Sequence, residues 1–187
     1  MTFVCKRFDE ALTGQTGRVS VDRVSLAVTD LPEVVRPFAW LLGTWRGDGV
    51  GGYPSLEADF RFSQEITFQC YGKPVIAYSS QTWAEDGRPL ARETGFWRPL
   101  ADSSLEVVLT VASGIVEVLY GALVDGPAGG HIGIESDLIA HTATAKQVDK
   151  DKRMYAVRGG KLMYAMEMAA MGKPLQPHLS AALDRVA

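Results

Sequence analysis

The feature that most constrains the fold is the alternation of apolar and polar residues that dominates the chain after Gly43. A period of two is typical of β-strands with one buried face. The expected strands are Leu56–Ile66, Val75–Trp83, Leu90–Pro99, Leu105–Val111, Ile115–Val124, Ile132–Ala145, Arg153–Val157 and Lys161–Met168. Short runs rich in Gly, Pro, Asp and Ser separate these segments and predict tight turns. Since long helical segments do not alternate with the strands, a parallel α/β sheet is not expected.

A series of about eight to ten strands joined by tight turns favours an antiparallel meander. Closing the meander into a barrel removes both of its unpaired edges. We therefore expect an all-β fold, an antiparallel up-and-down barrel of roughly ten strands. A barrel of that size has room for a ligand, so the methionines of the late strand, Met166 and Met168, are expected either in the core or in a cavity wall.

The chain is 187 residues long, which fits one domain. Residues 1–30 are polar and rich in turn formers, and we expect an extension there, with a possible strand at Arg18–Val28. Asp30 with the acidic turn after it predicts the N-cap of a short helix that ends at Gly43. The barrel domain is expected over residues 31–187.

Composition narrows the classes of partner. The formal net charge is −3, and the 19 Lys and Arg residues are scattered, which argues against a nucleic-acid partner. The two cysteines, Cys5 and Cys70, form neither a disulfide framework nor a zinc motif. No signal peptide and no apolar stretch of about 18 residues is visible, so neither secretion nor a membrane span is expected. The simplest expectation is a reducing, cytoplasmic setting.

Gly47, Gly49 and Gly52 match the spacing of a dinucleotide-binding loop. That loop needs a helix after it to receive the pyrophosphate, whereas an alternating strand follows here. Dinucleotide binding is therefore disfavoured. The glycines instead indicate a first strand whose backbone bends or lies close to another segment.

A wider set of motifs surrounds these glycines. The segment Gly43-Thr44-Trp45-Arg46-Gly47-Asp48-Gly49 is followed by Tyr53-Pro54, then by Glu135–Ala140, Thr142–Lys146 and the closing Pro174-Leu175-Gln176-Pro177-His178-Leu179. Together, over about residues 31–186, they resemble the nitrobindin family of haem-binding barrels, and its bacterial members most of all. The resemblance implies a ten-stranded barrel of the lipocalin and fatty-acid-binding type, closed at one end by the short helix.

The resemblance also implies a cofactor and an activity. It implies a ferric haem b, Fe(III), with His178 as the axial ligand of the iron, and a protein that binds nitric oxide and isomerises peroxynitrite to nitrate. No catalytic side chain beyond the haem iron is implied. Ser55 stands where the related pattern has Thr, and its hydroxyl is expected to contact the haem edge. Small molecules are the expected partners, and a homodimer is left open.

The residues themselves give independent support to His178. The chain has three histidines, and neutral imidazole is a standard haem ligand. Pro174 and Pro177 oppose both a regular helix and a central strand, so an irregular, rigid backbone is expected to hold His178. A surface histidine in a tail is the alternative. We expect His131 near a barrel mouth, and we assign His141 no role.

Haem propionates need cationic partners, and Arg153 is the candidate among the residues near expected turns. The alternative is a charged, exposed turn over Lys146–Arg153. The functional rival is a non-catalytic, lipocalin-like carrier or sensor of haem, nitric oxide or a small apolar ligand. A purely structural domain with a filled core is a third interpretation.

Overall fold

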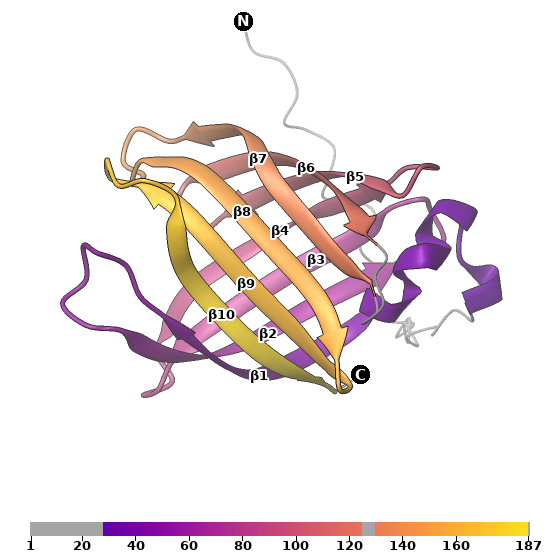
Figure 1. Ribbon diagram of the computed structural model, residues 1–187, viewed down its shortest axis with the longest axis horizontal. Coiled ribbons are helices and arrows are strands. Elements are labelled where there is room, and N and C mark those ends of the chain that lie inside the picture. Colours follow the sequence, from indigo (N-terminus) through magenta and orange to yellow (C-terminus); the bar gives the residue numbers. More distant parts are fainter. Residues whose placement is uncertain (1–27, 125–129, 187) are drawn as a thin grey trace, which may run out of the picture.

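Ten antiparallel strands close into a single barrel in the computed structural model, which describes residues 28–124 and 130–186 (Figure 1). The strands are β1 Gly43–Gly51, β2 Phe60–Cys70, β3 Ile76–Ala84, β4 Pro89–Pro99, β5 Ser104–Val111, β6 Ile115–Val124, β7 His131–His141, β8 Val148–Arg158, β9 Lys161–Ala170 and β10 Gln176–Arg185. Each strand pairs with the next in sequence, and β1 pairs with β10 to close the ring. The expected all-β, up-and-down barrel is confirmed.

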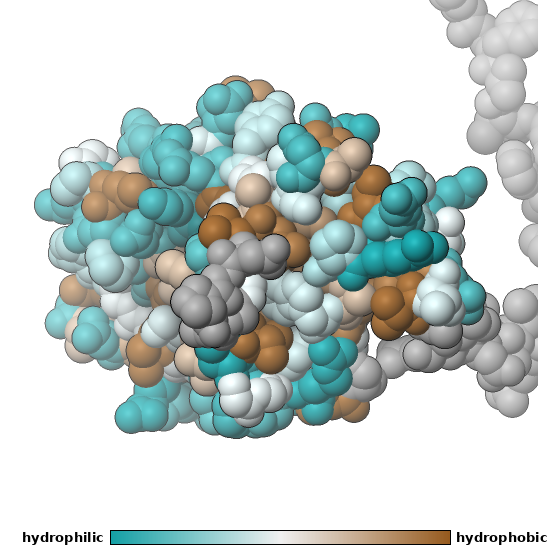
Figure 2. Space-filling model, turned by 45° about the vertical axis from the view of Figure 1, so that its right-hand side comes forward, coloured by the Kyte–Doolittle hydropathy of each residue, from teal (hydrophilic) through white to brown (hydrophobic). Residues whose placement is uncertain are grey.

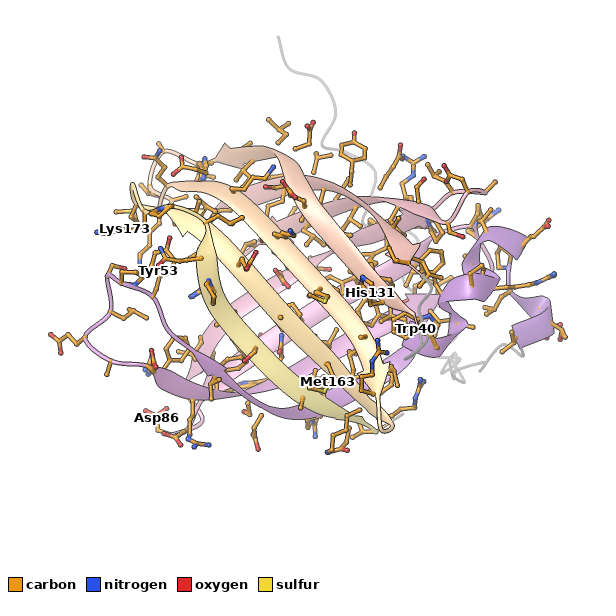
Figure 3. All side chains as sticks on the ribbon, in the orientation of Figure 1. Trp40, Tyr53, Asp86, His131, Met163 and Lys173 are labelled. Atoms are coloured by element: carbon orange, nitrogen blue, oxygen red, sulfur yellow. The ribbon has the colours of Figure 1, made fainter. Side chains whose placement is uncertain are left out.

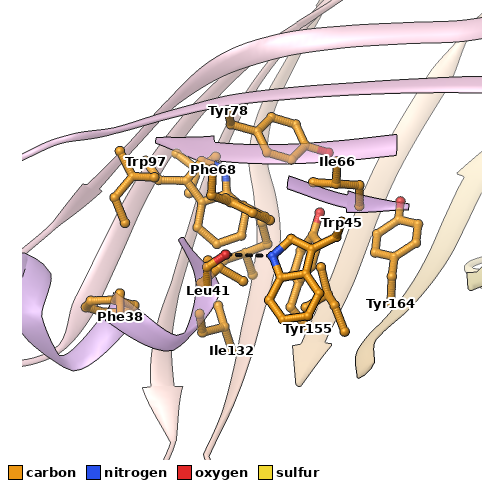
Figure 4. Close-up of a cluster of buried hydrophobic side chains, with 14 of the residues drawn as sticks. Phe38, Leu41, Trp45, Ile66, Phe68, Tyr78, Trp97, Ile132, Tyr155 and Tyr164 are labelled. Carbon is orange, nitrogen blue, oxygen red and sulfur yellow. Dashed lines mark hydrogen bonds between the residues drawn. The ribbon is translucent and has the colours of Figure 1, made fainter. Parts of the chain in front are cut away.

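The alternation in the sequence matches the two faces of the barrel wall. Along β2, for example, Phe62, Ile66 and Phe68 are buried, while their neighbours in sequence are more exposed. Most of the buried apolar side chains form one large cluster with an aromatic centre (Figure 4), and a smaller cluster consists of Tyr53, Ile115, Val148 and Ala170. On the face shown in Figure 2, polar and apolar residues are intermixed.

The inward positions of β1 at Gly47, Gly49 and Gly51 carry no side chain. A Cβ atom on Gly49 would lie 2.3 Å from the ring of Phe62, and one on Gly51 would lie 2.4 Å from the ring of Phe60. The glycines therefore let two aromatic rings of β2 pack against the backbone of β1. The expectation of a close backbone approach is confirmed.

Two short 3-10 helices, η1 Val28–Asp30 and η2 Glu33–Leu41, lie at one end of the barrel (Figure 1). Helix η2 buries Phe38 and Leu41, and the carbonyl of Leu41 accepts a 2.8 Å hydrogen bond from the indole of Trp45 (Figure 4). The expected N-cap was wrong: Pro32 occupies that position and Asp30 belongs to η1. Residues 1–27 of the expected extension, and with them all but the last residue of the strand expected at Arg18–Val28, lie outside the described residues.

Two expectations near the C-terminal end of the domain were wrong. Strand β8 begins at Val148, so Arg153 lies within a strand and not at its start. The proline-flanked segment was not expected to be a strand, yet it forms β10; the expected irregularity is present as a register shift between Pro177 and Leu179. A bulge accommodates a proline in a strand because the missing N–H is not required by the ladder at that point.

Candidate functional site

His178 lies at the register shift of β10. Pro177 is opposite Glu167 of β9 and Leu179 is opposite Met166, so the pairing with β9 skips His178. A bulge of this kind turns the extra residue out of the regular alternation and redirects its side chain. The backbone stays anchored on the other side, where the amide of Gly52 donates a 2.9 Å hydrogen bond to the carbonyl of His178.

The tautomer of His178 follows from its hydrogen bond. Its Nδ1 atom lies 3.0 Å from the carbonyl oxygen of Gly52, and a carbonyl oxygen can only accept. In the neutral ring Nδ1 therefore carries the proton, and Nε2 keeps the lone pair that binds a metal. A backbone carbonyl that orients an imidazole in this way is the usual arrangement behind a metal-binding histidine.

Tyr53 fixes the other side of the imidazole. The two rings meet edge to face, with their centroids 5.3 Å apart. The Tyr53 hydroxyl accepts a 2.8 Å hydrogen bond from the amide of Ala170 and lies 3.2 Å from the carbonyl oxygen of the same residue. Figure 3 shows Tyr53 at the end of the barrel opposite Trp40, which belongs to η2.

A cavity of about 610 Å³ opens beside His178. The described residues that line it are Val50, Gly51, Gly52, Tyr53, Pro54, Asp59, Ala165, Met166, Glu167, Pro177, His178, Leu179 and Ser180. Most of its walls are apolar or small, and its charged lining residues, Asp59 and Glu167, are both acidic. Its volume is within the range of about 300–1,000 Å³ that is typical of cofactor pockets. A neutral imidazole nitrogen at an apolar cavity suits a flat, apolar macrocycle with a central iron.

Arg153 lies inside the barrel, not in an exposed turn, and is 2% exposed. Its Nε donates to Asp151 at 2.9 Å, Nη1 to Glu93 at 2.8 Å and Nη2 to Glu117 at 2.7 Å. The structure does not bring Arg153 together with His178, because it is absent from the cavity lining and its donors point at carboxylates. Its role toward a propionate stays a prediction.

The charges of this group are unequal, since three carboxylates surround one guanidinium. Burial raises the pKa of Glu117 to about 8, although the charge of Arg153 lowers it and the charge of Asp151 raises it. A proton on Glu117 is also favoured by a hydrogen bond to Asp151. Burial therefore favours the protonated form of Glu117, and a proton there reduces the excess negative charge inside the barrel.

Ser55 is exposed in the turn after Pro54; Pro54 lines the cavity, whereas Ser55 is not among the described lining residues. The contact of Ser55 with a haem edge stays a prediction. His141 is structural, because its Nε2 accepts a 3.0 Å hydrogen bond from the amide of Val148. His131 lies toward the η2 end of the barrel, away from Tyr53 (Figure 3).

Several residues of the site were missed from the sequence. Tyr53 stood in a quoted motif, yet nothing marked its ring as the neighbour of His178. Glu167 and Asp59 gave no signal beyond their charge, whereas Met166 was expected in the core or in a cavity wall and is found in the wall. Gly52 contributes only a backbone carbonyl, for which a side-chain pattern carries no signal.

Comparison with known proteins agrees with this geometry. Residues 34–185 match the family described as the THAP4-like, heme-binding beta-barrel domain. A protein of Parafrankia sp. (strain EAN1pec) named peroxynitrite isomerase is 42% identical over 183 residues, covering 86% of this chain and 84% of its own length. A ferric nitrobindin-like protein of Kineococcus radiotolerans is 40% identical, with 84% and 96% covered.

A solved structure gives the same result for the fold. The crystal structure of Rv2717c from M. tuberculosis superposes with a TM-score of 0.77 at 37% identity, covering 84% of this chain and 99% of that one. No helix within residues 28–124 and 130–186 has the length and apolar character needed to cross a membrane. From the family match, the relatives and the shared barrel, the chain belongs to the THAP4-like, heme-binding β-barrel family, the nitrobindin type.

Proposed function

We propose that this protein holds a ferric haem b through Nε2 of His178, binds nitric oxide and isomerises peroxynitrite to nitrate. The observation that carries the proposal is the 3.0 Å contact between Nδ1 of His178 and the carbonyl oxygen of Gly52, which in the neutral ring assigns the metal-binding lone pair to Nε2, beside a cavity of about 610 Å³. Relatives of about the same length carry the name peroxynitrite isomerase.

The chain's residues have distinct parts in this proposal. Haem iron, when bound, supplies Lewis acidity toward the peroxide oxygen. His178 holds the iron, and Gly52 and Tyr53 hold the imidazole in one tautomer and one orientation. Met166 and Leu179, which also pack against the core, supply apolar walls that limit water around the ligand. No acid–base side chain is needed, since peroxynitrite and nitrate have the same atoms and the same charge.

Haem titration of wild type, His178→Ala and His131→Ala tests the ligand. We expect wild type and His131→Ala to bind one haem with the absorption spectrum of histidine-ligated ferric iron, and His178→Ala to lose that spectrum. His131 is the matched control because it lies toward the other end of the barrel. An unchanged spectrum in His178→Ala would refute the assignment of the ligand.

Peroxynitrite decay and nitrate yield, with and without haem, test the activity. We expect the haem-loaded protein to accelerate decay and raise the nitrate yield above that of the haem-free protein. Equal decay rates for the two forms would refute the isomerase activity and leave a non-catalytic carrier or sensor as the function.

We also propose that the protein is cytoplasmic, which is consistent with Cys70 forming no disulfide with a described residue. We propose in addition that it forms a homodimer, and analytical ultracentrifugation will test this.

A further inference from the structure

A continuous set of aromatic rings crosses the interior of the barrel. The ring centroids of Tyr78 and Trp97 are 5.9 Å apart, those of Trp97 and Tyr155 are 5.1 Å apart, and those of Tyr155 and Tyr164 are 5.1 Å apart. All four side chains are buried (Figure 4). Tyrosine and tryptophan are the most easily oxidised aromatic side chains, so contacts of this kind connect redox-capable groups.

The hydroxyl groups of these tyrosines differ in their partners. Tyr78 donates a hydrogen bond to Oε1 of Glu93. Tyr155 lies beside Tyr78 and Arg153, but its hydroxyl hydrogen-bonds to no carboxylate among the described residues. The described residues offer Tyr164 no carboxylate hydrogen bond either. Of the three, Tyr78 alone has a base positioned to take its proton.

Glu93 is held firmly in that position. Both of its oxygens accept from Nη1 of Arg153, at 2.8 and 2.9 Å. Arg153 is itself fixed by Asp151 and Glu117. Burial first, and the charge of Glu93 second, raise the pKa of Tyr78, so its phenol remains protonated in the resting protein. Loss of an electron from Tyr78 must therefore be accompanied by loss of its proton.

We propose that Tyr78 is a redox-active tyrosine that yields one electron to a one-electron oxidant, with its phenolic proton passing to Glu93. The Tyr78 O–H bond breaks, an O–H bond forms on the Glu93 carboxylate, and a neutral phenoxyl radical remains. The electron reduces the oxidant; with nitrogen dioxide radical, the product is nitrite. The site traps oxidising radicals inside the barrel, and it does not require the isomerase activity.

Trp97 and Tyr155 connect Tyr78 to the rest of the interior, but neither of them is the final site of oxidation. The indole Nε1 of Trp97 has no hydrogen-bond partner among the described residues, so an oxidised indole there has no acceptor for its proton. Tyr155 lacks a carboxylate for the same purpose. Tyr164 lies on β9 two positions from Met166, which lines the His178 cavity, so the chain of rings extends toward that cavity.

The test oxidises the haem-free protein with a photogenerated ruthenium(III) tris-bipyridine complex and records electron paramagnetic resonance and transient absorption. The proteins compared, the wild-type reference included, all carry Tyr71→Phe and Tyr120→Phe, because a dissolved oxidant reaches these exposed rings first. With those rings removed, we expect a tyrosyl radical in the wild-type reference and in Tyr155→Phe, and its loss in Tyr78→Phe. In Glu93→Gln the acceptor carboxylate is removed, so the radical is expected to form severalfold more slowly. Because each Phe variant lacks only a hydroxyl, matching circular dichroism spectra will establish that the barrel is retained.

A second measurement distinguishes loss of the Tyr78 radical from a failure of the variant to fold. In Tyr78→Phe with an intact barrel, oxidation is expected to stop at Trp97 and give an indole radical. An unchanged tyrosyl signal in Tyr78→Phe, loss of the signal in Tyr155→Phe, or no radical in wild type would each overturn the proposal. None of these outcomes depends on whether His178 binds haem, so failure here and failure of the proposed function are distinguishable.

Discussion

Nδ1 of His178 and the carbonyl oxygen of Gly52 lie 3.0 Å apart, although 126 positions separate the two residues in the chain. Gly52 follows β1 and His178 belongs to β10, so the contact spans the seam at which the barrel closes. The histidine proposed as the haem ligand is thus oriented by the pairing of the first strand with the last.

This arrangement predicts chemical rescue of a cavity variant. In His178→Gly we expect haem to lose its histidine-type spectrum and added imidazole to restore it, because a free imidazole fills the vacated space and can donate to the Gly52 carbonyl. Absorption titration with imidazole measures the rescue. His131→Gly is the control and should need no imidazole. Failure of imidazole to restore the spectrum would show that His178 is not the ligand.

Gly49→Ala is predicted to destabilise the barrel. The new Cβ would lie 2.3 Å from the Phe62 ring and 2.6 Å from the carbonyl oxygen of Ser180, so both β2 and the β1–β10 seam must shift. Overpacking of this kind costs about 1–3 kcal/mol of unfolding free energy. Urea denaturation measures the cost. The control is Gly133→Ala, whose Cβ meets nothing within 4 Å, and equal stabilities of the two variants would contradict the prediction.

Tyr53→Phe is predicted to lower the free energy of unfolding by removing a hydrogen bond beside His178. The lost hydroxyl leaves the amide of Ala170 without its 2.8 Å partner, and an unsatisfied buried group costs about 1–3 kcal/mol. Chemical denaturation should show this loss. Tyr71→Phe is a matched control, since Tyr71 is exposed, its hydroxyl bonds to the side chain of Gln69, and its removal should cost little. A larger loss in Tyr71→Phe would contradict the assignment.

The raised pKa of Glu117 predicts that the free energy of unfolding depends on pH. Its pKa is about 8 in the folded protein and near 4.5 when unfolded, so between these values the folded state holds a proton that the unfolded state has released. The stabilisation is complete below about pH 4.5 and is lost as the pH rises toward about 8. The slope is at most about 1.4 kcal/mol per pH unit for one proton.

The corresponding experiment compares unfolding free energies of wild type and Glu117→Gln across that range. We expect the wild type to lose stability relative to the variant as the pH rises, because glutamine does not titrate. Glu106→Gln, which removes an exposed partner of Arg98, should leave the wild-type slope intact. Parallel profiles for wild type and Glu117→Gln would contradict the prediction.

Most of the fold was predictable because alternation is a local signal. Segments such as Ile115–Val124 were bounded by turn residues and match the observed strand. Register is not local. Pro177 appeared to exclude a strand, yet a bulge accommodates it within β10, and the same bulge redirects His178.

The site was less predictable for a related reason. His178 was identified through a family motif, whereas its partner Gly52 contributes only a backbone atom from the far side of the seam. The neighbouring Asp151 and Lys152 gave Arg153 the signal of an exposed turn, but its burial depends also on the carboxylates of Glu93 and Glu117, which are 60 and 36 positions away. Sequence separation hides such groupings because no window of residues contains them.

The seam between β1 and β10 also sets when this site can exist during biosynthesis. On the ribosome β1 emerges early and remains an unpaired edge on one side until β10, the last strand of the barrel, has been translated. Contacts between such distant segments form late because loop-closure entropy opposes them. Haem capture by His178 is therefore expected only after translation of the whole barrel, which makes cofactor uptake a readout of completed folding.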